Sequence, residues 1–169
     1  MRRLLTIGIH TIQGFSSPAF NFLIIVFGIK VFGKADWASL INVMLWVFFG
    51  TFMLGWGNRD HLLRKYSQEP GKMYHAFFSN FLSRCLLLPF ALLFLLFFPI
   101  HISFWAILLV LLTFTYSSLS TLVVYHQKFS AQLLAEIIAF AIIFGSVFYL
   151  ETFDLETFLK IYTTAIAAK

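Results

Sequence analysis

Long apolar runs separated by short polar segments dominate the chain. A membrane-crossing helix needs about 20 mainly apolar residues, because each residue advances 1.5 Å through roughly 30 Å of hydrocarbon. Five complete spans are expected at residues 5–29, 37–56, 76–98, 102–125 and 131–150, and a sixth apolar helix at 155–169 is too short to cross. The pattern predicts an all-α integral membrane bundle of five complete transmembrane helices plus the start of a sixth.

The polar connections between these runs are short, so we expect a single transmembrane domain over residues 1–169. The longest polar stretch, residues 58–75, contains the turn signal Pro70-Gly71. The final run enters a helix without leaving it, which favours a fragment of a longer protein. A short re-entrant or surface helix at a natural C-terminus is the alternative.

Composition supports the same class. Apolar residues make up 60% of the chain and charged residues 11%, which is too little charge to cover a soluble core. The one cysteine, Cys85, excludes an internal disulfide framework and a cysteine-based zinc site.

Basic residues are distributed unevenly between the two sides of the predicted bundle. Seven lie on the side of the N-terminus and two on the other: Arg2, Arg3, Arg59, Arg64, Lys65, Lys72 and Lys128 against Lys30 and Lys34. Basic loops stay in the cytoplasm. We therefore expect a multi-pass protein of the bacterial inner membrane with a cytoplasmic N-terminus and the turn at 151–156 outside. Because the positive charge sets topology, we expect no nucleic-acid partner.

Two charged residues lie inside predicted spans, where a charge costs about 2.5–3.5 kcal/mol on insertion scales. Arg84 follows Asn80 by four positions and Glu136 follows Gln132 by four, so each pair shares a helix face. Similar depth would let Arg84 and Glu136 meet. The pattern indicates a polar cavity lining in the cytoplasmic half, with Arg84 attracting an anion. Alternatively, Arg84 snorkels to the interface.

The first two spans carry further polar positions that are candidates for the cavity, Gln13, Asn21 and Asn42. Such stripes are also typical of close helix packing. Pro18 predicts a kink in the first span. The sequence shows no metal-ligand spacing, phosphate-binding loop or catalytic set. We therefore predict no enzyme, metal or cofactor.

One stretch resembles a known family. It runs from Trp56 through Gly57, Asn58, Leu62, Leu63, Tyr66, Ser67 and Pro70, and is followed by Arg84 in the next span. This pattern resembles the first cytoplasmic loop of the Wzx-like polysaccharide and O-antigen flippases of the multidrug/oligosaccharidyl-lipid/polysaccharide exporter superfamily. Arg59 stands where lysine is common. The turn at 32–37 is similar to theirs but lacks the second glycine.

The resemblance implies most of the N-terminal lobe of a MATE-like transporter fold, with a C-terminal lobe missing. It implies alternating-access export of undecaprenyl-pyrophosphate-linked oligosaccharide, coupled to an ion gradient. Arg84 and the loop cations Arg59, Arg64 and Lys65 would attract the pyrophosphate or the anionic inner leaflet. Glu136 would pair with Arg84 or take part in ion coupling. Taken singly, each loop cation is also explained by topology alone.

Two other function classes stay open. A small-solute or multidrug exporter of the same superfamily would have a less cationic, more acidic cavity. A membrane-embedded enzyme of lipid or glycan metabolism would need a polar constellation at one interface, and its absence from the sequence argues against that class.

Overall fold

The computed structural model describes residues 2–150 and 154–169, and every regular element in these ranges is helical. The all-α prediction is confirmed for this part of the chain. The elements are α1 (Arg2–Phe32), α2 (Lys34–Gly55), α3 (Asn58–Gln68), η1 (Pro70–Lys72), α4 (Met73–Cys85), α5 (Leu88–Leu93), η2 (Phe94–Phe97), α6 (Ile100–Tyr125), α7 (Phe129–Tyr149) and α8 (Leu155–Ala167). The turn expected at 151–156 falls partly outside the described residues, at 151–153.

Four helical stretches of the described chain are long and apolar enough to cross a membrane. They are His10–Phe32, Lys34–Gln68, Ile100–Tyr125 and Phe129–Tyr149, the second of which joins α2 to α3. Two expectations therefore differ from the structure. The run at 76–98 is divided among α4, α5 and η2, and the polar stretch after residue 57 forms the helix α3.

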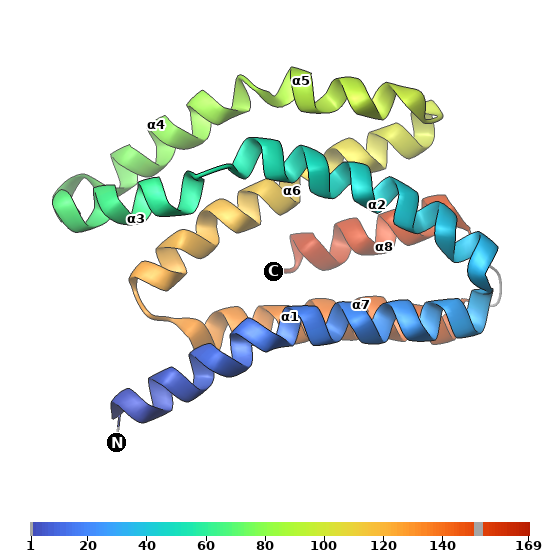
Figure 1. Ribbon diagram of the computed structural model, residues 1–169, viewed down its shortest axis with the longest axis horizontal. Helices are drawn as coiled ribbons and strands as arrows, with labels where there is room; N and C mark the ends of the chain where they lie inside the picture. Colours follow the sequence, from blue (N-terminus) through green and yellow to red (C-terminus); the bar gives the residue numbers. More distant parts are fainter. Residues whose placement is uncertain (1, 151–153) are drawn as a thin grey trace.

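The division of the third apolar run has a cause in the sequence. Pro89 has no backbone N–H and cannot donate to the carbonyl oxygen of Cys85 four residues earlier, where α4 ends. The chain tightens there, and the Leu87 amide donates to the carbonyl oxygen of Arg84 at 2.9 Å. The run still travels the length of the bundle from α4 to α6 (Figure 1).

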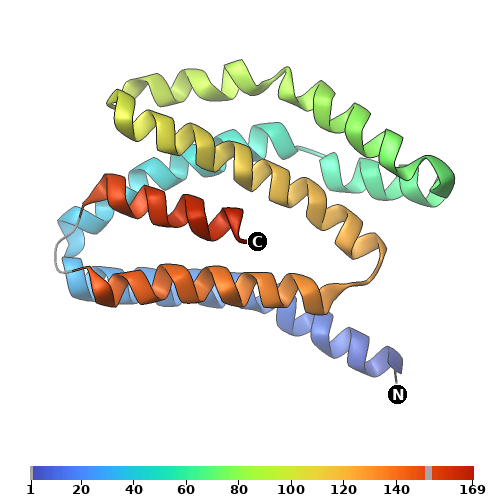
Figure 2. The same ribbon diagram turned by 180° about the vertical axis from the view of Figure 1, so that it is seen from behind.

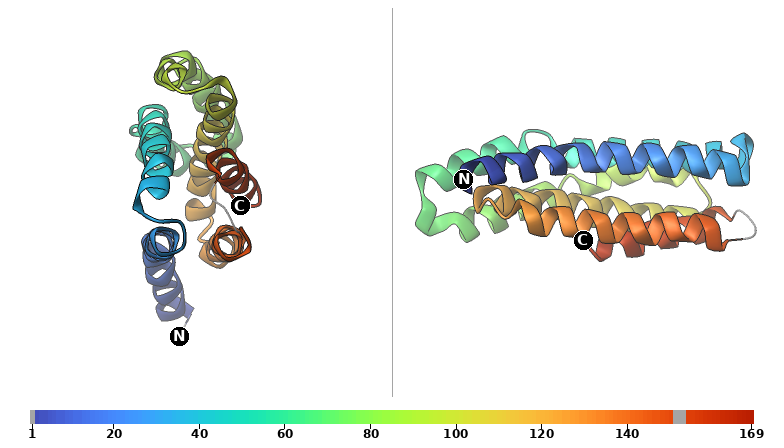
Figure 3. Two further views of the ribbon diagram at one scale, coloured as in Figure 1. Left: turned by 90° about the vertical axis from the view of Figure 1, so that its right-hand side faces the viewer. Right: turned by 90° about the horizontal axis from the view of Figure 1, so that it is seen from below.

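The helices lie roughly along one long axis (Figure 3, right). α1 packs beside α7, and α2 packs beside α6. From behind, α8 lies between α6 and α7 and contacts both (Figure 2). α1 remains helical through Pro18 and changes direction in its N-terminal half (Figure 1). The arrangement places α7 with α1 on one face and α8 on another.

Aromatic side chains fill the contact between the early and late helices. Trp37 of α2 and Phe158 of α8 are fully buried, and their rings meet edge to face with centroids 5.5 Å apart. Trp37 also lies directly over Gly28 of α1, where a Cβ would fall 2.4 Å from the indole ring. Gly28 therefore allows α1 and α2 to approach at their shared turn.

The two ends of the bundle differ in charge. α3, η1 and the α6–α7 turn lie at the same end as the N-terminus (Figure 1). This end, called the basic end below, carries the cations Arg59, Arg64, Lys65, Lys72 and Lys128. The opposite end has the turn between α1 and α2 with Lys30 and Lys34. The distribution agrees with the sequence count, and the orientation in the cell remains a prediction.

Candidate functional site

Glu136 of α7 is buried against α1 with only 6% of its surface exposed. The Ser16 hydroxyl donates to its Oε2 atom, and the Gln13 side-chain amide donates to its Oε1 atom at 3.4 Å. Both donors come from α1 and lie one helical turn apart, so they reach the same carboxylate. Glu136 thus links α7 to α1 through hydrogen bonds from two neutral side chains of α1.

Ser16 has two acceptors and only one hydroxyl hydrogen. Its Oγ atom lies 2.8 Å from the carbonyl oxygen of Gln13 and also contacts the Glu136 carboxyl group. When the hydrogen is directed at the carbonyl, the contact with Glu136 needs a proton on the carboxyl group. When it is directed at Glu136, either an ionised or a protonated carboxyl group can accept it. The Ser16 hydroxyl therefore contacts both acceptors without fixing the protonation state of Glu136.

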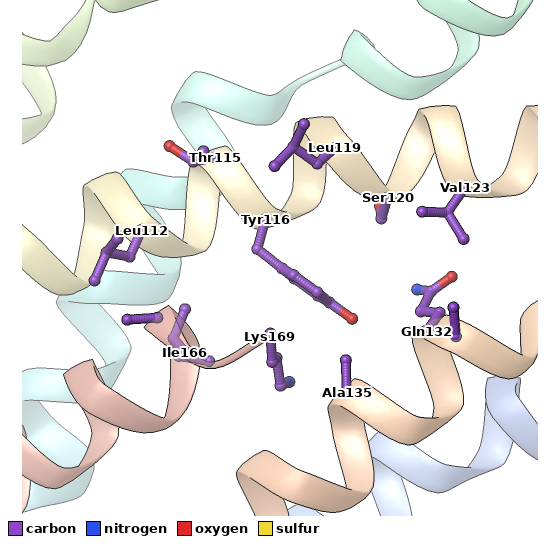
Figure 4. Close-up of a pocket in the computed structure, with 12 residues that line it drawn as sticks. Leu112, Thr115, Tyr116, Leu119, Ser120, Val123, Gln132, Ala135, Ile166 and Lys169 are labelled. Atoms are coloured by element: carbon purple, nitrogen blue, oxygen red, sulfur yellow. The ribbon is translucent and has the colours of Figure 1, made fainter. Parts of the chain in front are cut away.

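A pocket of about 250 Å³ lies between α6, α7 and the end of α8 (Figure 4). The Tyr116 hydroxyl, the Gln132 side chain and the Lys169 ammonium group contribute polar atoms to an otherwise mainly apolar lining. The Lys169 Nζ atom lies 5.0 Å from the centre of the Tyr116 ring, at cation–π distance. The Tyr116 Oη and Gln132 Oε1 atoms are buried without a hydrogen-bond partner in the described residues.

The pocket and Glu136 are neighbours, because Lys169 lines both the pocket and a hollow that Glu136 lines. The Glu136 carboxylate interacts electrostatically with Tyr116 and with Lys169. Lys169 also lines a small hollow of about 30 Å³ between α1 and α7, together with Asn21 and Glu136. We call this set the Glu136 site: Gln13, Ser16, Asn21, Tyr116, Gln132, Glu136 and Lys169.

Arg84 belongs to a different polar cluster. Its Nη1 atom donates to the carbonyl oxygens of Leu54 at 2.8 Å and Trp56 at 2.7 Å, at the C-terminal end of α2. Carbonyls in the last turn of a helix have no partner within it, so a cation stabilises them there. Among the described residues no ion pair joins Arg84 to Glu136, and the expected pairing is not formed.

Asn80 contributes to the same cluster as Arg84. Its amide donates to the Oδ1 atom of Asn58, whose own amide donates to the Ser118 Oγ atom at 3.1 Å. Asn58 begins α3 directly after Gly57, which has a left-handed φ of 65°. The cluster therefore fixes the bend between α2 and α3 against α4 and α6.

The other sequence candidates lie on the surface. Asn42 is exposed on α2 and lines none of the pockets described above. Arg59, Arg64 and Lys65 are exposed on α3. Sequence reasoning missed Ser16 and Tyr116, because a serine or tyrosine within an apolar run has no distinguishing spacing. The buried Asn58 was recognised only as part of the loop resemblance.

Every regular element in the described residues is helical, and four stretches are long and apolar enough to cross a membrane. This architecture is compatible with a helical membrane protein. No family model, curated protein or solved structure matches the chain. The site geometry and the sequence pattern are therefore the basis for assigning a function.

Proposed function

We propose that this chain forms the N-terminal lobe of a polysaccharide flippase that moves undecaprenyl-pyrophosphate-linked oligosaccharide across the bacterial cytoplasmic membrane. The observation that carries the proposal is Glu136, a buried carboxyl group shared by two apolar helices and adjacent to a mainly apolar pocket whose polar atoms come from Tyr116, Gln132 and Lys169. An ionisable group at such a position is expensive and marks ion or substrate pathways in membrane proteins. In the proposed cycle Glu136 exchanges the coupling proton.

The residues of the flippase-like loop support the same assignment, because they act together. Leu62 and Tyr66 of α3 are fully buried, Asn58 is buried at its start, and Arg84 caps the preceding helix. Because the residues of the motif pack together in one structural unit, they support the family resemblance more strongly than residues dispersed over the surface would. Under this proposal the unit holds the α2–α3 bend during the movements of alternating access.

Arg84 lines neither the pocket nor the hollow of the Glu136 site, and its Nη1 atom is engaged at the end of α2. Among the described residues, Lys169 is the one cation that lines the pocket, and it shares the adjoining small hollow with the acid Glu136. This lower positive charge favours the second candidate function, a small-solute or multidrug exporter of the same superfamily. Both candidates use Glu136 for coupling and differ in the substrate.

The test uses proteoliposomes containing the full-length gene product and an imposed pH gradient. Appearance of the lipid-linked glycan in the opposite leaflet is followed by lectin accessibility, and export of a small cationic dye is followed in parallel. Glu136→Gln keeps the size of the side chain and removes the titrating proton. The matched control is Glu156→Gln at the start of α8, where the carboxylate forms a surface ion pair with Lys160 at 2.7 Å.

We expect Glu136→Gln to abolish gradient-driven glycan transport, because it removes the buried carboxyl group that is proposed to carry the coupling proton. Glu156→Gln should transport like the unmodified protein. Equal gradient-driven transport by both variants would refute the coupling role. Export of the dye without glycan movement would replace the flippase by the small-solute exporter.

A further inference from the structure

A second pocket lies at the basic end, outside the Glu136 site. It has a volume of about 150 Å³ and lies between α3 and α4. Its lining includes the donors Lys65, Gln68, Lys72, His75 and Ser79, together with the carboxylate of Glu69. Ammonium, amide, imidazole and hydroxyl groups together supply the hydrogen-bond donors that phosphate oxygens accept.

The charge of this pocket is positive. Lys72 pairs with Glu69 at 3.0 Å on the exposed turn between the two helices. Lys65 forms no ion pair within the described part of the chain. One ammonium group at the rim is therefore available to an anionic ligand, and the Lys72–Glu69 pair is exposed enough to rearrange.

An exposed apolar stripe runs along α4 beside the pocket. Tyr74, Phe78 and Leu82 are spaced by four residues, and each leaves about two thirds of its surface uncovered. This spacing places them on one helix face, adjacent to the face with His75 and Ser79. Large exposed apolar side chains in this position are suited to contact with hydrocarbon, and an exposed tyrosine such as Tyr74 is of the type enriched where proteins meet lipid headgroups.

We propose that this pocket binds the phosphate headgroup of an anionic membrane lipid, whose acyl chains lie along the stripe formed by Tyr74, Phe78 and Leu82. The juxtaposition of a donor-rich cationic pocket with an exposed apolar stripe favours an amphiphile over a free ion. Anionic lipids of the adjacent leaflet gain about a fivefold preference from each nearby lysine. The inference does not depend on the proposed transport activity.

The experiment measures phosphatidylglycerol bound to the purified full chain by native mass spectrometry, with phosphatidylcholine as the neutral comparison. We expect Lys65→Gln and Lys72→Gln each to weaken phosphatidylglycerol binding about fivefold, following the electrostatic contribution of one lysine. Phe78→Ser should weaken it as well, since it removes part of the acyl-chain contact. The matched control is Lys34→Gln at the opposite end, which should bind like the unmodified chain.

Two outcomes would overturn the proposal. Equal weakening by Lys34→Gln and Lys65→Gln would show that total charge, and not the pocket, attracts the lipid. Displacement of the lipid by inorganic phosphate, with no effect of Phe78→Ser, would show a phosphate site without a lipid. All substituted side chains are exposed, and unchanged gel-filtration profiles will establish that the variants are folded.

Discussion

Replacing Arg84 tests whether its side chain holds the end of α2. Arg84→Ala removes two hydrogen bonds from a charged donor, each of a kind that contributes about 1.5–3 kcal/mol. The two bonds are unequal. Trp56 is largely exposed, so its carbonyl oxygen recovers other partners, whereas Leu54 lies fully buried and its carbonyl is left without one. The loss therefore falls on the Leu54 bond, and we expect Arg84→Ala to destabilise the fold by about 2–3 kcal/mol.

The assay is equilibrium unfolding in mixed micelles by titration with sodium dodecyl sulfate, followed by far-ultraviolet circular dichroism. Arg64→Ala on α3 is the matched control, because this exposed arginine has no such bond among the described contacts and its loss should change stability by less than about 0.5 kcal/mol. Arg84→Lys keeps one charged donor and should fall between them. If the free energy of unfolding of Arg84→Ala equals that of Arg64→Ala, the capping role is refuted. The hypothesis that Arg84 attracts an anion or snorkels to the interface would then be favoured.

Two further predictions use the same unfolding titration. Gly28→Ala places a Cβ 2.4 Å from the buried Trp37 ring and should destabilise the fold by about 1–3 kcal/mol. Gly14→Ala, where nothing lies within 4 Å, is the control, and equal stability of both variants would contradict the close approach. Asp154 caps α8, and the hydrogen bond from Thr157 holds the pKa of its carboxyl group below the ordinary value of 3.8. Its stabilisation is complete above that value and is lost as the pH falls through the lower folded pKa. Asp154→Asn keeps a capping oxygen and should lack this acid-dependent loss; the same loss in both proteins would assign it to another group.

Helix positions could be predicted where apolar runs were uninterrupted. The run expected at 131–150 corresponds to α7, Phe129–Tyr149, which is long and apolar enough to cross a membrane. The run at 76–98 satisfied the same count of apolar residues, yet Pro89 removed the hydrogen bond that would have continued α4. A count of apolar residues therefore located the run at 76–98. It could not show that the helix is interrupted, because the interruption depends on the one backbone N–H that Pro89 lacks.

The helix α3 shows a second limit of sequence reasoning. Its composition is polar because most of its side chains are exposed, and only Asn58, Leu62 and Tyr66 are buried. These three lie four residues apart, as one helix face requires. Three such positions in an 11-residue polar segment are too few to distinguish a helix from a loop by sequence alone. Their burial becomes apparent only once α4 and α6 are packed against α3.

Charge inside an apolar run was enough to single out Glu136, and the four-residue spacing singled out Gln132 with it. Their partners could not be found in the same way. Similar depth suggested that Arg84 would meet Glu136, but depth leaves the rotation of each helix and the order of packing undetermined. Packing α7 on α1 brought Ser16 to the carboxylate, while Arg84 turned to α2.

The contact between α1 and α7 has a consequence for biosynthesis. Ser16 and Glu136 are 120 positions apart, so at ribosomal rates of roughly 5–20 residues per second α1 is made about 6–24 seconds before its partner. During that interval the α1 side of this contact consists of the neutral donors Ser16 and Gln13, which a nascent span tolerates far better than a charge. The carboxylate arrives last, when both donors are already present. Because Gln13 and Ser16 precede Glu136 in the chain, the hydrogen-bond donors for the carboxyl group are already synthesised when Glu136 is inserted.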